Sequence, residues 1–353
     1  MEIQTEEQRQ EYARRRARRR RMYRVRQRSI ELAVLLGIVA GVVVPIWLFS
    51  GNTVAPSSGP APLASTAAPT PAPVYPAVTA DTYTLTDEVD ANHAILVDVT
   101  DHTVVASKSP DTVCFPASVS KVMTLLVAVE NITDFTDTFT MTYHITNPLH
   151  EAEATVAGFI SGEVIVLEDL LYGVILPSGA DACQALAVYV SGSEEAFVQK
   201  MNDRAKQMGL KNTHFANTSG LHDPQHYTTC EDMVIILNEA MKNPHCRQVL
   251  STYQYTTAAT TQHPEGLLLT STMFSRMRGD EPDGALVIAG KTGYTSQARH
   301  TMVSYAQGEN GHDYILVTMD GSNRWKATYD AIDTYTMFCS SAGTTGTAST
   351  TTP

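Results

Sequence analysis

A serine and a lysine three residues apart stand at the start of an apolar stretch of this chain. In CFPASVSKVMT, residues 114–124, Pro116 favours a helix start, so Ser118 and Lys121 fall in the first turn, on one face. The apolar residues that follow predict a helix buried on most sides. Burial favours a neutral lysine amine, which can take the proton of a serine hydroxyl. The pair therefore has the chemistry of an activated nucleophile.

The same pair has a plainer interpretation as a capping serine beside a solvated lysine. A pattern with two fixed positions arises by chance on the order of once in a chain of this size. Two further stretches add weight to the catalytic interpretation. LPSGADA places Ser178 and Gly179 in a tight turn before a helix, and GKTGYTS places Lys291, Thr292 and Gly293 at the end of a strand. A glycine at this point lets the backbone of a ligand come close.

Taken in this order, the three stretches resemble the penicillin-recognising serine peptidases and β-lactamases, whose motifs are Ser-x-x-Lys, Ser-x-Asn and Lys-Thr-Gly. The resemblance narrows to the D-alanyl-D-alanine carboxypeptidases, the low-molecular-mass penicillin-binding proteins. It rests on FPASVSKVMT, LLYGVILPSGADA, GLKNTHFANTSGLHDPQHYTT and GKTGYTSQA, and it covers the chain from about 85 to 340.

The resemblance implies a function and a role for each motif residue. The protein would remove the terminal D-Ala from peptidoglycan stem pentapeptides through an acyl-enzyme, and β-lactam antibiotics would be covalent inhibitors. No cofactor or metal is implied. Ser118 would be the nucleophile, Lys121 its general base, and Ser178 a proton relay to the leaving amine. The substrate-binding positions would be Lys291 and Thr292 at the terminal carboxylate, Tyr294 N–H with Ser118 N–H in the oxyanion hole, and Gly293, Gly179 and Ala180 along the cleft.

The chain departs from the family pattern at two positions. Ala180 stands where the family usually has asparagine, and Arg299 stands where relatives often have glycine. The first departure removes an amide contact to the substrate and some support for Lys121. Asp181 matches the aspartate of the family and is interpreted as a helix-capping residue in preference to a catalytic one.

Two alternatives to a carboxypeptidase stay open. A class A β-lactamase would need the glutamate of a Glu-x-x-Leu-Asn motif for deacylation, and the nearest string, VIILN at Val234–Asn238, begins with valine. That alternative is disfavoured. The other is a catalytically weak or inactive module that binds peptidoglycan stems, for which Ala180 is the best support.

The elements that must position these residues can be predicted from periodicity. The predicted strands are HAILVDV (93–99), TVVASK, ALVIAGKTG, TMVSYAQ and YILVTMD, with an Asn-Gly turn between the last two. Helices are predicted at 193–210 and over WKATYDAIDTYTMFC. Two strands, a helical block, three strands and a helix predict an α+β fold. We expect a mainly antiparallel five-stranded sheet flanked by helices, with a helical subdomain, as in β-lactamases and transpeptidases.

Charge and composition divide the chain into five segments. Eleven of the 25 basic residues are arginines between Arg9 and Arg28, and an uncharged apolar run follows from Leu32 to Phe49. This pattern favours a membrane anchor with a cytoplasmic N terminus and an extracellular catalytic domain over a cleaved signal peptide or a nucleic-acid patch. The predicted segments are 1–28 cytoplasmic, 29–49 transmembrane, 50–81 a Pro/Ala/Ser/Thr-rich linker, 82–340 the carboxypeptidase domain and 341–353 a disordered tail.

Cysteines and histidines give weaker signals. The cysteine count is five, an odd number, without a CxxC or metal-ligand spacing, so at least one is expected to be free. His222 and His226 have the spacing of zinc ligands on a helix, but Pro224 between them favours a loop and structural histidines.

Overall fold

The computed structural model describes residues 75–277 and 279–339. The predicted cytoplasmic segment, the transmembrane segment, most of the linker and the tail lie outside this part of the chain. Within it, none of the helices has the length and apolar composition that crossing a bilayer requires. Residues 75–81, the end of the predicted linker, lie against the folded domain. The Tyr75 hydroxyl donates to Asp232, and Ala77 forms a parallel bridge with Thr103.

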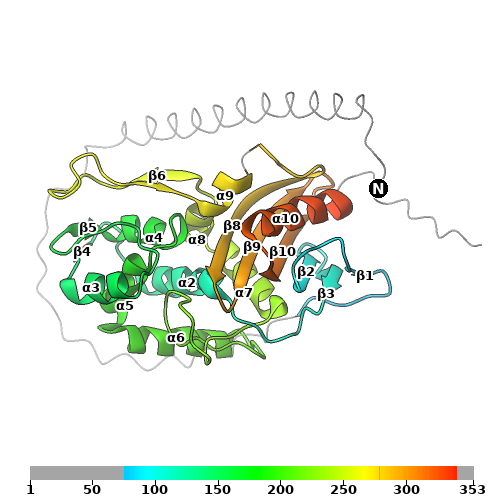
Figure 1. Cartoon of the computed structure of the whole chain (residues 1–353), viewed down its shortest axis with the longest axis horizontal. Coiled ribbons are helices and arrows are strands. Elements are labelled where there is room, and N and C mark those ends of the chain that lie inside the picture. The colour runs from blue at the N-terminus through cyan, green and yellow to red at the C-terminus, as the bar shows by residue number, and fades with distance from the viewer. Residues whose placement is uncertain (1–74, 278, 340–353) are drawn as a thin grey trace, which may run out of the picture. The chain divides into compact units, whose positions relative to one another are not determined.

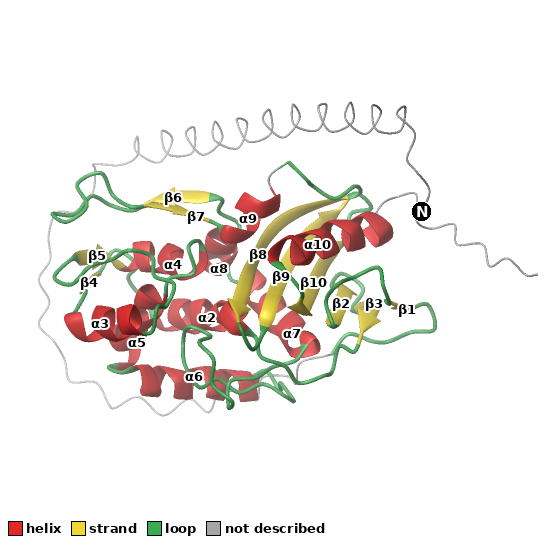
Figure 2. Cartoon of the chain, in the orientation of Figure 1, coloured by secondary structure: helices red, strands yellow, loops and turns green. Residues whose placement is uncertain are grey.

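The described elements follow one another in an order close to the predicted one (Figure 2). They are β1 (Tyr83–Thr84), β2 (His93–Asp98), β3 (Thr103–Lys108), the 3₁₀ helix η1 (Ala117–Ser120), α2 (Lys121–Asn131), β4 (Thr138–Thr140), α3 (Tyr143–Glu151), β5 (Val164–Val166), α4 (Leu167–Ile175), α5 (Ala180–Ser191), α6 (Glu194–Gln207), α7 (Cys230–Lys242), α8 (Pro244–Leu250), β6 (Gln254–Thr256), β7 (Leu268–Thr270), α9 (Thr272–Met277), β8 (Ala285–Thr295), β9 (Arg299–Gly308), β10 (Asp313–Gly321) and α10 (Arg324–Cys339).

The main sheet has the order β1-β3-β2-β10-β9-β8, with six strands where the sequence predicted five. All five predicted strands are present, and their pairing is antiparallel as expected. The sixth is the two-residue strand β1, which pairs parallel to β3 at the edge. Both of its residues are exposed, so it carries no alternation of buried and exposed side chains that the sequence could have revealed.

Helices cover both faces of the sheet, because its strands alternate between two apolar sides. Ile95 and Val97 face the core shared with the helical subdomain, while Leu96 and Leu316 face α10 and its buried Tyr335. Figure 1 shows α10 lying across one face, and α7 packs against the other. The sheet is thus the middle layer, and its edge strand β8 borders the helical subdomain.

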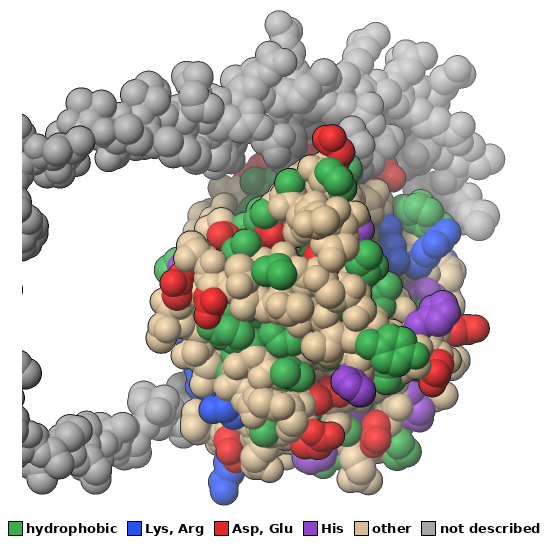
Figure 3. Space-filling view, turned by 90° about the vertical axis from the view of Figure 1, so that its left-hand side faces the viewer, with side chains coloured by type: hydrophobic (Ala, Val, Ile, Leu, Met, Phe, Trp, Pro, Cys, Tyr) green, Lys and Arg blue, Asp and Glu red, His purple; other side chains and the backbone are tan. Residues whose placement is uncertain are grey.

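The helical subdomain is built around α2, whose residues Lys121 to Val129 are all buried. Helices α4, α5, α6, α7 and α8 pack around it. Two small two-stranded sheets, β4–β5 and β6–β7, extend this subdomain and were not predicted. Figure 3 shows its outer end, where hydrophobic side chains are interspersed with polar ones. Tyr143 and Val164 are among the exposed apolar side chains of the subdomain.

Candidate active site

Ser118 and Lys121 lie side by side where η1 passes into α2. The Lys121 Nζ is 3.0 Å from Ser118 Oγ and also donates to the carbonyl oxygen of Ser219. Only 2% of the Lys121 side chain surface is exposed. This burial lowers the pKa of Lys121, and the nearby Cys183 and Asp181 oppose the shift. The predicted juxtaposition is therefore confirmed, and the burial favours an amine that can accept a proton.

The loop at 217–220 holds Lys121 from the opposite side. Asn217 Oδ1 accepts hydrogen bonds from the N–H groups of Ser219 and Gly220, at 3.1 and 2.8 Å. Gly220 has φ +78°, and a Cβ there would lie 2.0 Å from the Ala117 carbonyl oxygen, so only glycine fits. No role for this loop was predicted from the sequence, although the string Asn-Thr-Ser-Gly is a turn signal.

Ser178 occupies a strained turn between α4 and α5. Its φ of +71° is rare for a residue with a side chain, and its buried Oγ has no hydrogen-bond partner among the described residues. Gly179 is the N-cap of α5, and a Cβ there would lie 2.7 Å from the backbone nitrogen of Ala157. Ala180 begins the helix with a buried side chain, and its N–H donates to Thr155 O at 2.8 Å. The turn is thus held tightly against the loop at 155–159.

Asp181 fastens that same loop. Its carboxylate accepts hydrogen bonds from the N–H groups of Ala157, Gly158 and Phe159, at 2.7, 3.1 and 3.2 Å. It also accepts one from Ala182 N–H in the first turn of its own helix, at 2.9 Å. Burial raises the pKa of Asp181 against the effect of these donors. The predicted capping role is wrong, because Gly179 is the N-cap of α5 and Asp181 lies within its first turn. The three bonds to the loop could not be seen in the sequence.

Strand β8 brings the third motif against Ser118. The Lys291 side chain is buried, and its Nζ donates to Thr292 O at 2.7 Å. Burial, followed by repulsion from Lys121, lowers the pKa of Lys291 well below its ordinary value. At Gly293 a Cβ would lie 2.8 Å from the backbone nitrogen of Ser118. The absence of a side chain at Gly293 is therefore what lets β8 approach Ser118.

Two threonines that were not predicted as site residues connect the three motif segments. Thr301 on β9 donates to Pro116 O at 2.9 Å and so fixes the chain just before Ser118. The Thr272 hydroxyl is 2.7 Å from that of Thr292, and Thr272 N–H donates to Leu176 O at 3.1 Å. The predicted Tyr294 is 59% exposed and stacks on His300 with ring centroids 4.5 Å apart. The contacts thus join all three motif segments.

The remaining candidates have structural partners. Arg299 pairs with Asp320 at 2.9 Å. His226 is buried in a loop, as expected, and its Nδ1 accepts from Ala216 N–H at 3.2 Å. Burial lowers its pKa to about 4. His222 packs edge-on against Phe115. All five cysteines are free thiols.

Comparison with known proteins agrees with this geometry. The family model described as D-alanyl-D-alanine carboxypeptidase, peptidase S11, matches residues 79–323. The chain belongs to this family. Among curated carboxypeptidases of the family, DacF of Bacillus subtilis is 31% identical over 63% of this chain and 55% of its own length. DacB2 of Mycobacterium tuberculosis is 31% identical over 64% of this chain and 74% of its own. The chain spans about half the length of the first curated relatives it matches.

Solved structures of a DD-transpeptidase and of a D-alanyl-D-alanine carboxypeptidase confirm the predicted fold. A mutant of the Streptomyces K15 DD-transpeptidase superposes with a TM-score of 0.63 at 26% identity, covering 69% of this chain and 95% of that one. The D-alanyl-D-alanine carboxypeptidase from Mycobacterium tuberculosis gives a TM-score of 0.60 at 28% identity, covering 69% and 90%. The α+β sheet flanked by helices is therefore the transpeptidase fold, with the sixth strand as the correction.

Proposed function

We propose that this protein is a serine-type D-alanyl-D-alanine carboxypeptidase that forms an acyl-enzyme at Ser118. The observation that carries the proposal is the 3.0 Å contact between Ser118 Oγ and the buried Lys121 Nζ. A lysine that is desolvated in this way is a suitable base for a serine hydroxyl. Membership in the family supports the substrate class, a peptidoglycan stem peptide ending in D-Ala-D-Ala.

The first chemical step is attack of Ser118 Oγ on the carbonyl carbon between the two D-Ala residues. The Lys121 amine takes the hydroxyl proton, and the oxyanion is stabilised by the N–H groups of Ser118 and Tyr294. The C–N bond then breaks; Ser178 passes its proton to the departing amine of D-Ala and regains one from the Lys121 ammonium, which becomes a neutral amine again. The buried Oγ of Ser178 has no hydrogen-bond partner among the described residues, so it can both accept a proton and donate one to the amine. Water then hydrolyses the ester and releases Ser118.

The residues proposed to bind the substrate lie on β8 and on the turn before α5. Lys291 and Thr292 hold the terminal carboxylate, and Gly293 leaves room for the backbone beside Ser118. Gly179 and Ala180 line the turn on the other side. Because Ala180 has no amide, a water or a neighbouring polar group takes over the contact that asparagine would make.

The proposal includes attachment to the cell membrane. The arginines before Arg28 and the apolar run Leu32–Phe49 support a single-pass anchor with a cytoplasmic N terminus. The segment 50–81 then acts as a spacer that carries the domain outside the cell.

The inactive binding module is the competing function, and Ala180 favours it. The β-lactamase has less support, because the position of the required glutamate is Val234, a buried residue of α7. One experiment separates all three. Purified protein is treated with penicillin and followed by intact mass, and D-Ala release is measured from a range of stem pentapeptides.

A carboxypeptidase gives one stable adduct, which Ser118→Ala abolishes, together with D-Ala release. An adduct without release from any peptide would identify the binding module, and rapid loss of the adduct with turnover of penicillin would identify a β-lactamase. An adduct that survives Ser118→Ala would remove Ser118 from its assigned role.

A further inference from the structure

Thr272 lies between two segments of the active site although it belongs to no motif. It is the first residue of α9, and a single residue separates it from the end of β7. Its hydroxyl is 2.7 Å from the hydroxyl of Thr292 on β8. Its N–H donates to Leu176 O, two residues before Ser178. One residue therefore spans the gap between the Ser178 turn and the strand that carries Lys291.

We propose that Thr272 is a positioning residue that orients the hydroxyl of Thr292 for recognition of the terminal carboxylate of the substrate. This inference rests on the proposed function, in which Thr292 binds that carboxylate. A carboxylate can only accept hydrogen bonds, so Thr292 must donate to it. The single proton of Thr292 is then used, and the 2.7 Å contact requires Thr272 to be the donor. Thr272 thus determines that the Thr292 hydroxyl accepts from Thr272 and donates to the ligand.

The orientation matters because the two threonines can pair in two ways. If Thr292 donated to Thr272, it would present only lone pairs to the cleft and repel a carboxylate. When Thr272 donates, the Thr292 hydroxyl points its proton at the ligand, and the two hydrogen bonds polarise one another.

The position of Thr272 is fixed on both sides. Ser271 N–H donates to Tyr253 O at 2.8 Å, and Ser275 Oγ donates to Thr272 O at 3.2 Å. On the β8 side, Met273 packs so closely on Gly290 that a Cβ there would lie 2.5 Å from its sulfur. Thr272 therefore has little freedom to move away from Thr292.

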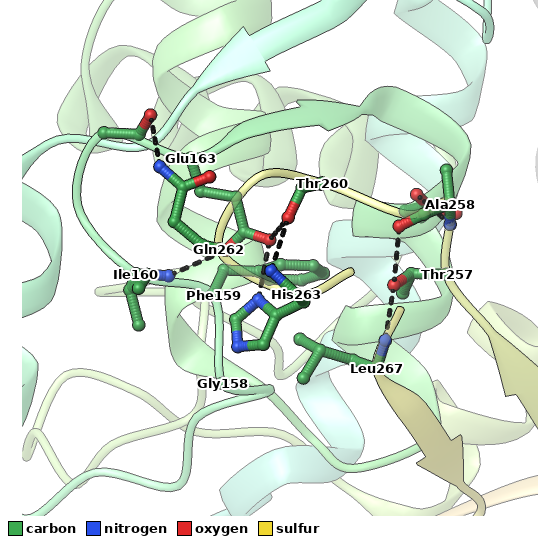
Figure 4. A network of polar contacts seen from close by, with 12 residues as sticks. Gly158, Phe159, Ile160, Glu163, Thr257, Ala258, Thr260, Gln262, His263 and Leu267 are labelled. Carbon is green, nitrogen blue, oxygen red and sulfur yellow. Dashed lines mark hydrogen bonds and ion pairs between the residues drawn. The ribbon is translucent and has the colours of Figure 1, made fainter. Parts of the chain in front are cut away.

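The β6–β7 sheet that leads to Thr272 is itself tied to the helical subdomain (Figure 4). The buried Glu163 accepts from Thr260 Oγ1 at 2.7 Å and lies 2.8 Å from His263 Nδ1. Across the loop, Leu267 N–H donates to Thr257 Oγ1 at 2.8 Å (Figure 4). These bonds hold the long connection between β6 and β7 on the subdomain, so the chain enters α9 from a fixed direction.

The test compares penicillin with penicillin methyl ester, which keeps the reactive amide and lacks the carboxylate. Acylation rates are measured for the natural protein and for Thr272→Val, which removes the hydroxyl and keeps the shape. We expect the rate with penicillin to fall by about tenfold, because one hydrogen bond to a charged group is weakened. The rate with the ester should change less than about twofold, and Thr272→Ser should restore the preference for the acid.

Thr270→Val is the matched control. Thr270 lies two residues earlier, on β7, and its hydroxyl accepts from the exposed Gln254 side chain. It should leave both rates unchanged. If Thr272→Val does not fold, Thr272→Ala at this half-buried position provides the same comparison.

Equal loss with acid and ester, or failure of the serine variant to restore the preference, would show that Thr272 only supports the fold. Absence of acylation in the natural protein would instead overturn the proposed function, and this inference with it.

Discussion

Gly293→Ala tests whether the close approach of β8 to Ser118 matters for the proposed reaction. A Cβ at this position would lie 2.4 Å from Thr301 Oγ1, 2.8 Å from Ser118 N and 3.1 Å from Val119 N, whereas ordinary contact begins at 3.4 Å. The Thr301 side chain cannot turn away freely because it donates to Pro116 O. The backbone at Ser118 would therefore have to move by about 0.6 Å relative to β8 to restore ordinary contact.

The displacement should affect catalysis more than stability. A misplacement of 1 Å at a reacting group can cost about a hundredfold in rate, so we expect acylation by penicillin to slow by about 10- to 100-fold. The assay is the rate of labelling by a fluorescent penicillin, with thermal unfolding measured on the same samples. Separation of β8 from η1 should cost about 1 to 3 kcal/mol of stability.

Gly192→Ala is the control for this experiment. Gly192 ends α5 with φ +79°, and a Cβ there would meet nothing within 4 Å. Its alanine variant should lose about 1 kcal/mol of stability from backbone strain and keep the acylation rate. If folded Gly293→Ala is acylated within about threefold of the natural rate, the geometry at Ser118 does not limit the reaction as argued here.

Three further predictions concern Lys121, His226 and Ala180. Because burial lowers the pKa of Lys121, the acylation rate should rise with pH and level off below 10.5, the ordinary pKa of lysine. Lys121→Arg should remove acylation, since a guanidinium stays protonated. An arginine variant that is still acylated would contradict the role of Lys121 as a base. The pKa of His226 is lowered from 6.5 to about 4, so the unfolded chain binds a proton that the folded chain does not, and stability should fall by up to about 3 kcal/mol as the pH drops from 6.5 to 4. Urea unfolding across this range should show a smaller fall for His226→Gln, and an unchanged slope would remove His226 as its cause. Ala180→Asn should change the rate of D-Ala release by about tenfold and penicillin acylation by less, and equal changes in the two rates would show that this position does not contact the peptide.

The sequence by itself determined the local geometry and the family. Ser118 and Lys121 are three residues apart on a helical turn, so local backbone geometry alone brings them together. The five principal strands were visible because alternating side chains must reach two buried faces, and the same pattern gave the order of the fold. The membrane anchor at 29–49 remains a prediction from charge and hydropathy.

Only the tertiary structure decided the contacts between segments distant in the chain. The bond from Lys121 to Ser219 joins residues 98 positions apart, and the three loop amides on Asp181 come from residues more than twenty positions away. Thr272 looks like any other polar residue at a helix start until folding places it beside Thr292. Periodicity records which face of an element is buried, and it carries no information about which polar group will lie opposite. For that reason the contact between Ser118 and Lys121 could be predicted from the sequence, whereas the residues that hold the pair in place could not.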